Sequence, residues 1–248
     1  MALAREAAVA IEACHRAGSL LVEFFSRGGI ETQSKDKLQD VVTQADFEAE
    51  RLILDLLAES WPEDGFLAEE SGRSTGPGAR VWCVDPLDGT ANFAAGYPHW
   101  AVAIALLEGE EPVLAVTHDP LRAETFVAHG ASLESPGGGL RTVLRVEDAL
   151  VADNRPYPHR EPIHPLELLL RRTRGRRESG SMALDFAWLA TGRLDAVAYE
   201  RSDRLWDYIG GELLVGCAGG AVGIADSERD IAVAACPELT EILCEKIT

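Results

Sequence analysis

The sequence predicts an α+β protein in which helical layers alternate with layers of mostly antiparallel strands. Three observations favour this fold class: two amphipathic helical patterns open the chain, short β-rich runs follow, and the last third alternates helices with apolar strands. Because 46% of its 248 residues are apolar and 26% charged, the chain has an ordinary globular composition. It can form one large domain or two closely packed halves.

The first helix is predicted from Leu3 to Phe25, where apolar residues recur at helical spacing until Gly28-Gly29 interrupts them. A second helix is predicted in "TQADFEAERLILDLLAESW". There, Thr43 and Asp46 stand as the cap and third residue of a capping box, and leucines supply an apolar face.

Four strands are predicted next, in "RVWCVD", "WAVAIALL", "PVLAVTHD" and "ETFVAH", joined by hairpin-like connections. From Gly130 to Pro165 the sequence becomes irregular and rich in glycine and proline. We therefore expect an N-terminal half over residues 1–135 and a C-terminal half over 136–248.

The C-terminal half is predicted to contain two helices, in "SMALDFAWLATG" and "DYIGGELLVGCAGG". Its strands are expected in "RLDAVAY", "AVGI" and "IAVAA".

The net charge of −18 disfavours a nucleic-acid or anionic-membrane partner and favours a cation. Five cysteines without CxxC spacing predict neither a disulfide framework nor a zinc knuckle, so a reducing cytoplasm is expected. Arg5, Glu6 and Glu12 interrupt the first apolar pattern as no signal-peptide core would allow. The apolar run "AVAIALL" is too short to span a membrane.

Acidic residues follow apolar stretches at three places: Glu69 and Glu70 in "FLAEESG", Asp85 and Asp88 in "VDPLDG", and Asp207 in "RLWDYIGG". A carboxylate at the end of a buried strand needs a basic partner or a bound cation. Taken singly, each segment also has a purely structural interpretation. "VDPLDG" can be a turn, Glu69 and Glu70 can be a solvated surface pair, and Asp207 can mark the start of a helix. In the same way, Thr43 and Asp46 can form a capping box and nothing more.

Together, the acidic segments predict a metal site, because Mg²⁺ prefers oxygen ligands and several carboxylates can enclose two or three ions. A turn between Asp85 and Asp88 could aim both carboxylates and the Leu87 carbonyl at one point. Gly89 and Thr90 would then open a helix whose free N–H groups could hold a phosphate.

Five segments, in order, closely resemble the inositol monophosphatase family of Mg²⁺-dependent, lithium-sensitive phosphatases. They are "DVVTQADFEAE", "LAEESG", "WCVDPLDGTANF", "GSMALDFAWLATGRLDAVAYE" and "LWDYIGGELLVGCAGG". The resemblance implies an α-β-α-β-α sandwich, usually a homodimer, with its site between the two halves.

By this resemblance, Glu69 and Asp85 with the Leu87 carbonyl would hold a first Mg²⁺. Asp85, Asp88 and Asp207 would hold a second, and Glu69 would touch a third, weaker ion. Mn²⁺ is the expected substitute metal.

The resemblance also implies roles in catalysis. Thr90 and Asp46, helped by Thr43, would orient and deprotonate the attacking water, with Glu69 also counted among the catalytic residues.

Further residues are implied on the substrate side. Gly89, Thr90 and Asp207 would face the phosphate and substrate, and Glu200 aligns with an acidic residue that faces the polyol. A solvated turn glutamate is the alternative interpretation of Glu200. Lys35 aligns with a lysine close to the family's site.

The predicted function is hydrolysis of a small polyol or sugar phosphate, foremost inositol monophosphate. The alternatives are a histidinol-phosphate, nucleotide 3'-phosphate, sugar-bisphosphate or specialised biosynthetic phosphatase. Ala91 after "DGT" favours the polyol type, because the histidinol-phosphate and nucleotide relatives often have Lys there. A regulatory binding module that uses the basic run Arg171 to Arg177 is the non-enzymatic alternative.

Overall fold

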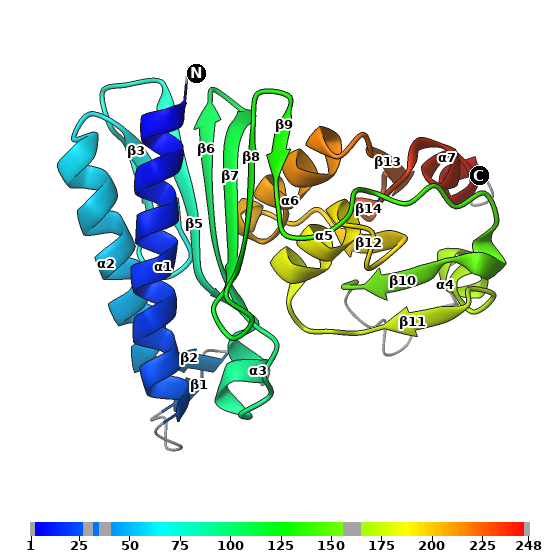
Figure 1. Ribbon diagram of the computed structural model, residues 1–248, viewed down its shortest axis with the longest axis horizontal. Coiled ribbons are helices and arrows are strands. Elements are labelled where there is room, and N and C mark those ends of the chain that lie inside the picture. Colours follow the sequence, from blue (N-terminus) through cyan, green and yellow to red (C-terminus); the bar gives the residue numbers. More distant parts are fainter. Residues whose placement is uncertain (1–2, 27–31, 35–40, 156–164, 246–248) are drawn as a thin grey trace.

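The computed structural model describes residues 3–26, 32–34, 41–155 and 165–245. Within them, a seven-stranded and a five-stranded sheet separate three layers of helices (Figure 1). The layers run in the order α1 and α2, seven-stranded sheet, α5 and α6, five-stranded sheet, α4 and α7. The α+β class and the layered sandwich expected from the sequence are therefore confirmed.

The outermost helices, α1 (Ala4–Ser26) and α2 (Gln44–Ser60), cover one face of the large sheet, as the helical periodicity predicts. The face that α1 buries consists mostly of small residues, so the helix can approach β6 and β7 closely. Just before α2, a two-stranded antiparallel pair forms from β1 (Thr32–Ser34) and β2 (Val41–Thr43). None of the described helices combines the length and apolar character that a membrane crossing requires.

The large sheet has the strand order β4-β3-β5-β6-β7-β8-β9. Its strands are β3 (Gly65–Ala68), β4 (Gly72–Ser74), β5 (Arg80–Asp88), β6 (Ala101–Glu108), β7 (Glu111–Asp119), β8 (Glu124–His129) and β9 (Ser132–Glu134). The four long strands predicted from the sequence, β5 to β8, form an antiparallel meander. The short strands were not predicted, because three or four residues carry too little periodicity to identify a strand.

The second sheet has the order β11-β10-β12-β14-β13, with β10 parallel to both of its neighbours. Its strands are β10 (Leu150–Asp153), β11 (Gly175–Arg177), β12 (Ala196–Glu200), β13 (Ala221–Asp226) and β14 (Ile231–Ala235). The predicted division of the chain after residue 135 falls between β9 and β10, a segment that also holds the 3₁₀ turn η1 (Val146–Asp148). This division stays a prediction.

The remaining helices are α3 (Thr90–Ala94), α4 (Pro165–Leu170), α5 (Met182–Ala190), α6 (Leu205–Cys217) and α7 (Pro237–Glu245). Helices α5 and α6 lie between the two sheets and pack very closely on each other. A Cβ atom on Gly211 would lie 2.3 Å from the Phe186 ring, so only glycine allows this approach. The close packing sets the position of the first turn of α6, which carries Asp207.

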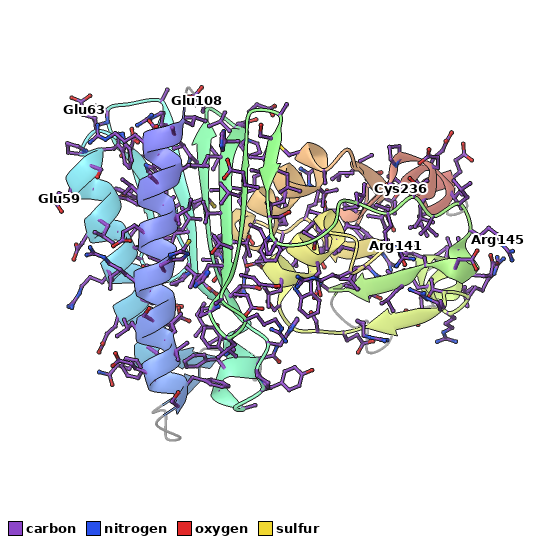
Figure 2. The ribbon with its side chains drawn as sticks, in the orientation of Figure 1. Glu59, Glu63, Glu108, Arg141, Arg145 and Cys236 are labelled. Carbon is purple, nitrogen blue, oxygen red and sulfur yellow. The ribbon has the colours of Figure 1, made fainter. Side chains whose placement is uncertain are left out.

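The basic run from Arg171 to Arg177 is largely neutralised by acidic neighbours. Its ion pairs are Arg171 with Glu167, Arg172 with Glu147, Arg174 with Asp195, and Arg176 with Asp153, Glu167 and Glu178. Arg141 and Arg145 on the same side of the molecule (Figure 2) also have acidic partners within 4 Å. The arginines therefore do not form the uncompensated positive patch that a docking module would use.

Candidate active site

The end of β5 carries the first two acidic residues of the candidate site. Residues three apart on a regular strand point to opposite faces of a sheet. Here the pairing with β6 shifts between Asp85, opposite Ala103, and Asp88, opposite Ala101. This β-bulge adds one residue to β5 and turns both carboxylates to the same side. The predicted turn between the aspartates is therefore wrong, because strand pairing continues through Asp88.

Asp85 is almost fully buried, with 2% of its surface exposed. Its Oδ1 accepts the Leu87 backbone N–H at 3.0 Å, which holds the bulged segment in one conformation. The Leu87 carbonyl oxygen accepts the Thr90 hydroxyl at 3.0 Å.

Asp88 connects the seven-stranded sheet to helix α5. Its Oδ1 accepts the Met182 N–H at 3.1 Å, and its Oδ2 accepts the Ala183 N–H at 3.0 Å and the Ser181 hydroxyl. Asp88 thus caps the N-terminus of α5 from another element. Ser181 stands at the N-cap position but makes no side-chain cap, so the sequence pattern alone did not indicate its contact with Asp88.

Gly89 follows Asp88 with φ at +94°, a conformation that favours glycine. A Cβ atom there would lie 3.1 Å from the carbonyl oxygens of both Gly180 and His99. The next helix, α3, begins at Thr90 as predicted, but it is only five residues long. Its first N–H groups can therefore act as local donors, with little support from a helix dipole.

Asp46 approaches this segment from the first turn of α2 and has 1% of its surface exposed. The Thr90 hydroxyl lies 3.4 Å from Asp46 Oδ2, within reach of a long hydrogen bond. The structure thus brings together the two residues that were predicted to orient and deprotonate the attacking water. Thr43 ends β2, directly before α2, and the role of its side chain stays a prediction.

Glu69 and Glu70 occupy the turn between β3 and β4. Each of these glutamates and Asp46 offers a carboxylate oxygen within 4.8 Å of the other two, a spacing compatible with a shared cation. Glu70 was absent from the predicted ligand set, although it adjoins Glu69 in the sequence. The resemblance assigned a role to Glu69 alone, and only the path of the turn shows that both carboxylates reach Asp46.

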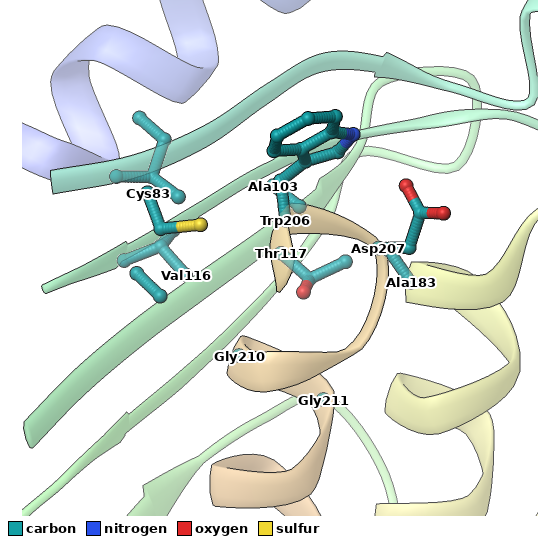
Figure 3. A pocket seen from close by; sticks show the side chains of 11 residues that line it. Cys83, Ala103, Val116, Thr117, Ala183, Trp206, Asp207, Gly210 and Gly211 are labelled. Carbon is teal, nitrogen blue, oxygen red and sulfur yellow. The ribbon is translucent and has the colours of Figure 1, made fainter. Parts of the chain in front are cut away.

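Asp207 lies in the first turn of α6, beside a small cavity between this helix and the seven-stranded sheet. Figure 3 shows Asp207 and Trp206 at the start of α6, facing Ala183 of α5 and Cys83 of β5. The cavity volume is about 10 Å³. This volume corresponds to about one water molecule, so the cavity is too small to be the substrate pocket.

The carboxylates shift one another's ionisation. Burial raises the pKa of Asp85 well above its ordinary value, and four neighbouring carboxylates raise it further. These four belong to Glu69, Asp88, Asp207 and Asp46. The candidate site is therefore a cluster of like charges drawn from four parts of the chain.

Two other members of the cluster show the same effect. Burial raises the pKa of Asp88 to about 7, although its three hydrogen bonds oppose the shift. Burial, then the charges of Asp88 and Glu69, raise the pKa of Asp207 to about 8. These shifts are what a cation would reverse, because a bound cation favours the ionised form of each carboxylate.

One predicted residue has no contact with the cluster among the described residues, and another cannot be placed. Glu200 is the half-buried last residue of β12, and none of the contacts recorded for the described residues joins it to the carboxylates. Lys35 lies outside the described residues.

The donor set fits a hard divalent cation. It consists of carboxylate oxygens and the Leu87 carbonyl, with no imidazole or thiolate among the members described above. Mg²⁺ is usually bound by a few carboxylates and by phosphate oxygens of the substrate. Glu69 and Glu70 are partly exposed, so a cation held there could also be reached by a substrate from solvent.

Comparison with known proteins gives one consistent result. The model of the "Inositol monophosphatase family" matches residues 3–247. A protein named inositol-1-monophosphatase from Caulobacter vibrioides is 36% identical over 233 residues, covering 89% of this chain and 90% of that protein. The "Nus factor SuhB" of Escherichia coli strain K12 is 35% identical over 222 residues, covering 86% of this chain and 83% of that protein.

A crystal structure of the extragenic suppressor protein suhB from Bartonella henselae superimposes with a TM-score of 0.87. The two chains are 30% identical, and the match covers 97% of each.

Proposed function

The chain belongs to the inositol monophosphatase family, and on that premise we propose that it is a Mg²⁺-dependent phosphomonoesterase acting on a small polyol or sugar phosphate, foremost an inositol monophosphate. The observation that carries this proposal is the clustering of the carboxylates: Asp46, Glu69 and Glu70 offer oxygens within 4.8 Å of one another, and buried Asp85 has four charged neighbours. Such a cluster costs folding free energy unless protons or a cation neutralise it. A phosphatase of this family requires the cation for its chemistry.

In the proposed assignment, three metal positions share the cluster. The first uses Glu69, Asp85 and the Leu87 carbonyl, the second uses Asp85, Asp88 and Asp207, and a weaker third uses Glu69. The spacing of Asp46, Glu69 and Glu70 supports extending the third position to Glu70. When bound, Mg²⁺ would supply positive charge to the phosphate oxygens and acidify a water molecule, and Mn²⁺ could take its place.

The proton is proposed to leave the attacking water through Thr90. The Thr90 hydroxyl would turn from the Leu87 carbonyl, 3.0 Å away, to Asp46 Oδ2, 3.4 Å away. Its oxygen can then accept the proton of the water while its own proton passes to Asp46. Thr43, at the end of β2, would assist this step. The backbone N–H groups of Gly89 and Thr90 would hold the phosphate and align phosphorus with the water.

The substrate class is tested by a screen of the purified protein with Mg²⁺. The panel contains inositol 1-phosphate, glycerol 2-phosphate, fructose 1,6-bisphosphate, histidinol phosphate and adenosine 3',5'-bisphosphate. We expect the highest kcat/KM on inositol 1-phosphate or another polyol phosphate, and inhibition by lithium. A strong preference for histidinol phosphate or adenosine bisphosphate would overturn the polyol assignment.

Glu200→Ala tests the proposed contact with substrate hydroxyls. We expect kcat/KM for inositol 1-phosphate to fall by about 1 to 3 kcal/mol in transition-state stabilisation, because a hydroxyl would lose its acceptor. Hydrolysis of 4-nitrophenyl phosphate, which lacks those hydroxyls, should change little. Glu228→Ala, which removes an exposed carboxylate between β13 and β14, is the control. Equal losses on both substrates would reduce Glu200 to a structural role.

A non-enzymatic role is the second candidate, since relatives about 35% identical carry the name Nus factor. The net charge of −18 and the ion-paired arginines between Arg171 and Arg177 argue against direct nucleic-acid binding. Filter binding of RNA at physiological salt checks this, and retention of RNA at micromolar protein would favour the second candidate.

We further propose a cytoplasmic homodimer. The five cysteines are odd in number and lack CxxC spacing, a pattern that agrees with a reducing compartment. Sedimentation equilibrium measures the oligomeric state, and a monomer at assay concentration would contradict the dimer.

A further inference from the structure

Glu50 in helix α2 is a buried carboxylate with no part in the ligand set above. It lies four residues after Asp46, on the same face of the helix, with 4% of its surface exposed. Like charges at this spacing repel each other, and burial increases the cost of both. A buried glutamate at this position lowers the stability of the fold unless hydrogen-bond donors compensate its carboxylate.

The partners of Glu50 are backbone groups of the β3–β4 turn. Its Oε2 accepts the Glu70 N–H at 2.7 Å, and its Oε1 accepts the Ser71 N–H at 2.8 Å. Both oxygens of one carboxylate thus hold two successive peptide groups, through charge-assisted hydrogen bonds that constrain position and orientation.

The other side of the same turn is held by the sheet. The Glu69 N–H donates to the Val84 carbonyl of β5 at 3.2 Å, and Ala68 pairs with Gly72 where the hairpin closes. The turn is therefore fixed between β5 on one side and Glu50 on the other. Its two acidic side chains, Glu69 and Glu70, meet Asp46 within 4.8 Å.

We propose that Glu50 is a positioning residue for metal binding: through the Glu70 and Ser71 N–H groups it holds the acidic turn beside Asp46, where the carboxylates of Glu69 and Glu70 can reach the cation. Asp46 keeps its proposed role as the proton acceptor, whereas Glu50 acts through the turn. This inference rests on the proposed function for the identity of the metal, and the contacts that carry it involve only this chain's residues.

Glu50→Gln tests the proposal, because glutamine has nearly the same size but replaces one acceptor oxygen with an NH₂ group that faces a backbone N–H. We expect the Kd for Mg²⁺, measured by calorimetry without substrate, to rise about 10- to 100-fold, the usual cost of losing a residue that orients a metal ligand. The kcat at saturating Mg²⁺ should stay close to the wild-type value, since excess metal restores the site.

Glu48→Gln is the matched control, since Glu48 is on the same helix and its carboxylate accepts a hydrogen bond from the Gln44 side chain. It makes the same change in charge at nearly the same distance from the helix start. A second readout needs no metal: in EDTA, amide hydrogen exchange at residues 69–71 should be faster in Glu50→Gln than in Glu48→Gln. A generally loosened structure would instead exchange faster throughout α2 and β5.

Unchanged Mg²⁺ affinity in Glu50→Gln relative to Glu48→Gln would overturn the inference, and so would a lower kcat with an unchanged Kd. Glu50→Asp, which keeps the charge but shortens the reach, provides the same comparison should Glu50→Gln not fold. Failure of both variants to fold would assign Glu50 to the fold itself and also count against the inference. A wild-type protein that binds Mg²⁺ but hydrolyses no phosphate ester would contradict the proposed function alone.

Discussion

Asp207→Asn is expected to reduce turnover by about 10³-fold or more, on the scale of losing a main electrostatic contact in the transition state. Asparagine keeps the size of the side chain but removes a negative charge from the proposed second metal position. We expect the loss in kcat as well as in Mg²⁺ affinity, measured by steady-state kinetics at several Mg²⁺ concentrations.

The same substitution should stabilise the metal-free protein. Burial and neighbouring carboxylates raise the pKa of Asp207 to about 8, so at about pH 8.5 the folded state holds a largely ionised carboxylate against its environment. Removing that charge should raise the melting temperature in EDTA. Asp203→Asn, which changes an exposed carboxylate just before α6, should alter neither activity nor metal affinity greatly. A near wild-type rate for Asp207→Asn at saturating Mg²⁺ would refute its assignment as a ligand.

Asp88→Asn should also lose activity, but we expect it to destabilise the fold. The Asp88 carboxylate accepts two backbone N–H groups and the Ser181 hydroxyl. An asparagine presents an NH₂ group in place of one acceptor oxygen, which leaves a buried donor unsatisfied at a cost of about 1–3 kcal/mol. Urea unfolding in EDTA measures this loss. An unchanged unfolding midpoint would show that the link between Asp88 and α5 contributes little.

Mg²⁺ is expected to have the second large effect, on both activity and stability. EDTA should abolish turnover, and Mg²⁺ at 100 times its Kd should stabilise the folded state by about 2.7 kcal/mol through mass action. Thermal melts in EDTA and in Mg²⁺ measure this difference. Coincident melting curves would contradict a metal site in the carboxylate cluster.

The pH dependence of the metal-free protein follows from the same cluster. The pKa values of Asp88 and Asp207 rise from 3.8 to about 7 and about 8 on folding. Between pH 3.8 and about 8 the folded state therefore binds more protons than the unfolded state, so the free energy of unfolding falls as pH rises. Metal binding competes with these protons, so Mg²⁺ should stabilise more strongly at high pH.

Melts at about pH 7 and pH 8.5 give the clearest comparison. The pKa of His118 is lowered to about 4, mainly by burial, and that of His99 is also lowered. In this window both histidines are neutral in the folded chain and at most about a quarter protonated in the unfolded chain, so their opposite effect on stability is small. A metal-free protein that is more stable at pH 8.5 than at pH 7 would contradict the pKa shifts.

The sequence by itself determined the long elements of the fold and the family. Helices α1 and α2 repeat their apolar residues at helical spacing. Helices α5 and α6 and strands β5 to β8 are longer apolar runs that are buried at consecutive positions, so their length and their flanking turn residues identify them rather than a period. The acidic motifs identified the family, which the family model and the relatives confirm. The short strands β3, β10 and β11 have too few residues to show a period.

Only the tertiary structure decided how the acidic groups are held. The "VDPLDG" segment suggested a turn, whereas pairing with β6 makes it a bulge that turns Asp85 and Asp88 to one side. The partners that fix the site lie far away in sequence: Ser181 is 93 residues from Asp88, and Glu70 is 20 residues from Glu50. A sequence pattern shows which side chains can accept hydrogen bonds. It cannot show which backbone N–H groups they reach, because these groups are chemically alike at nearly every residue. The packing of α2 and α5 against the large sheet decides which N–H groups Glu50 and Asp88 meet.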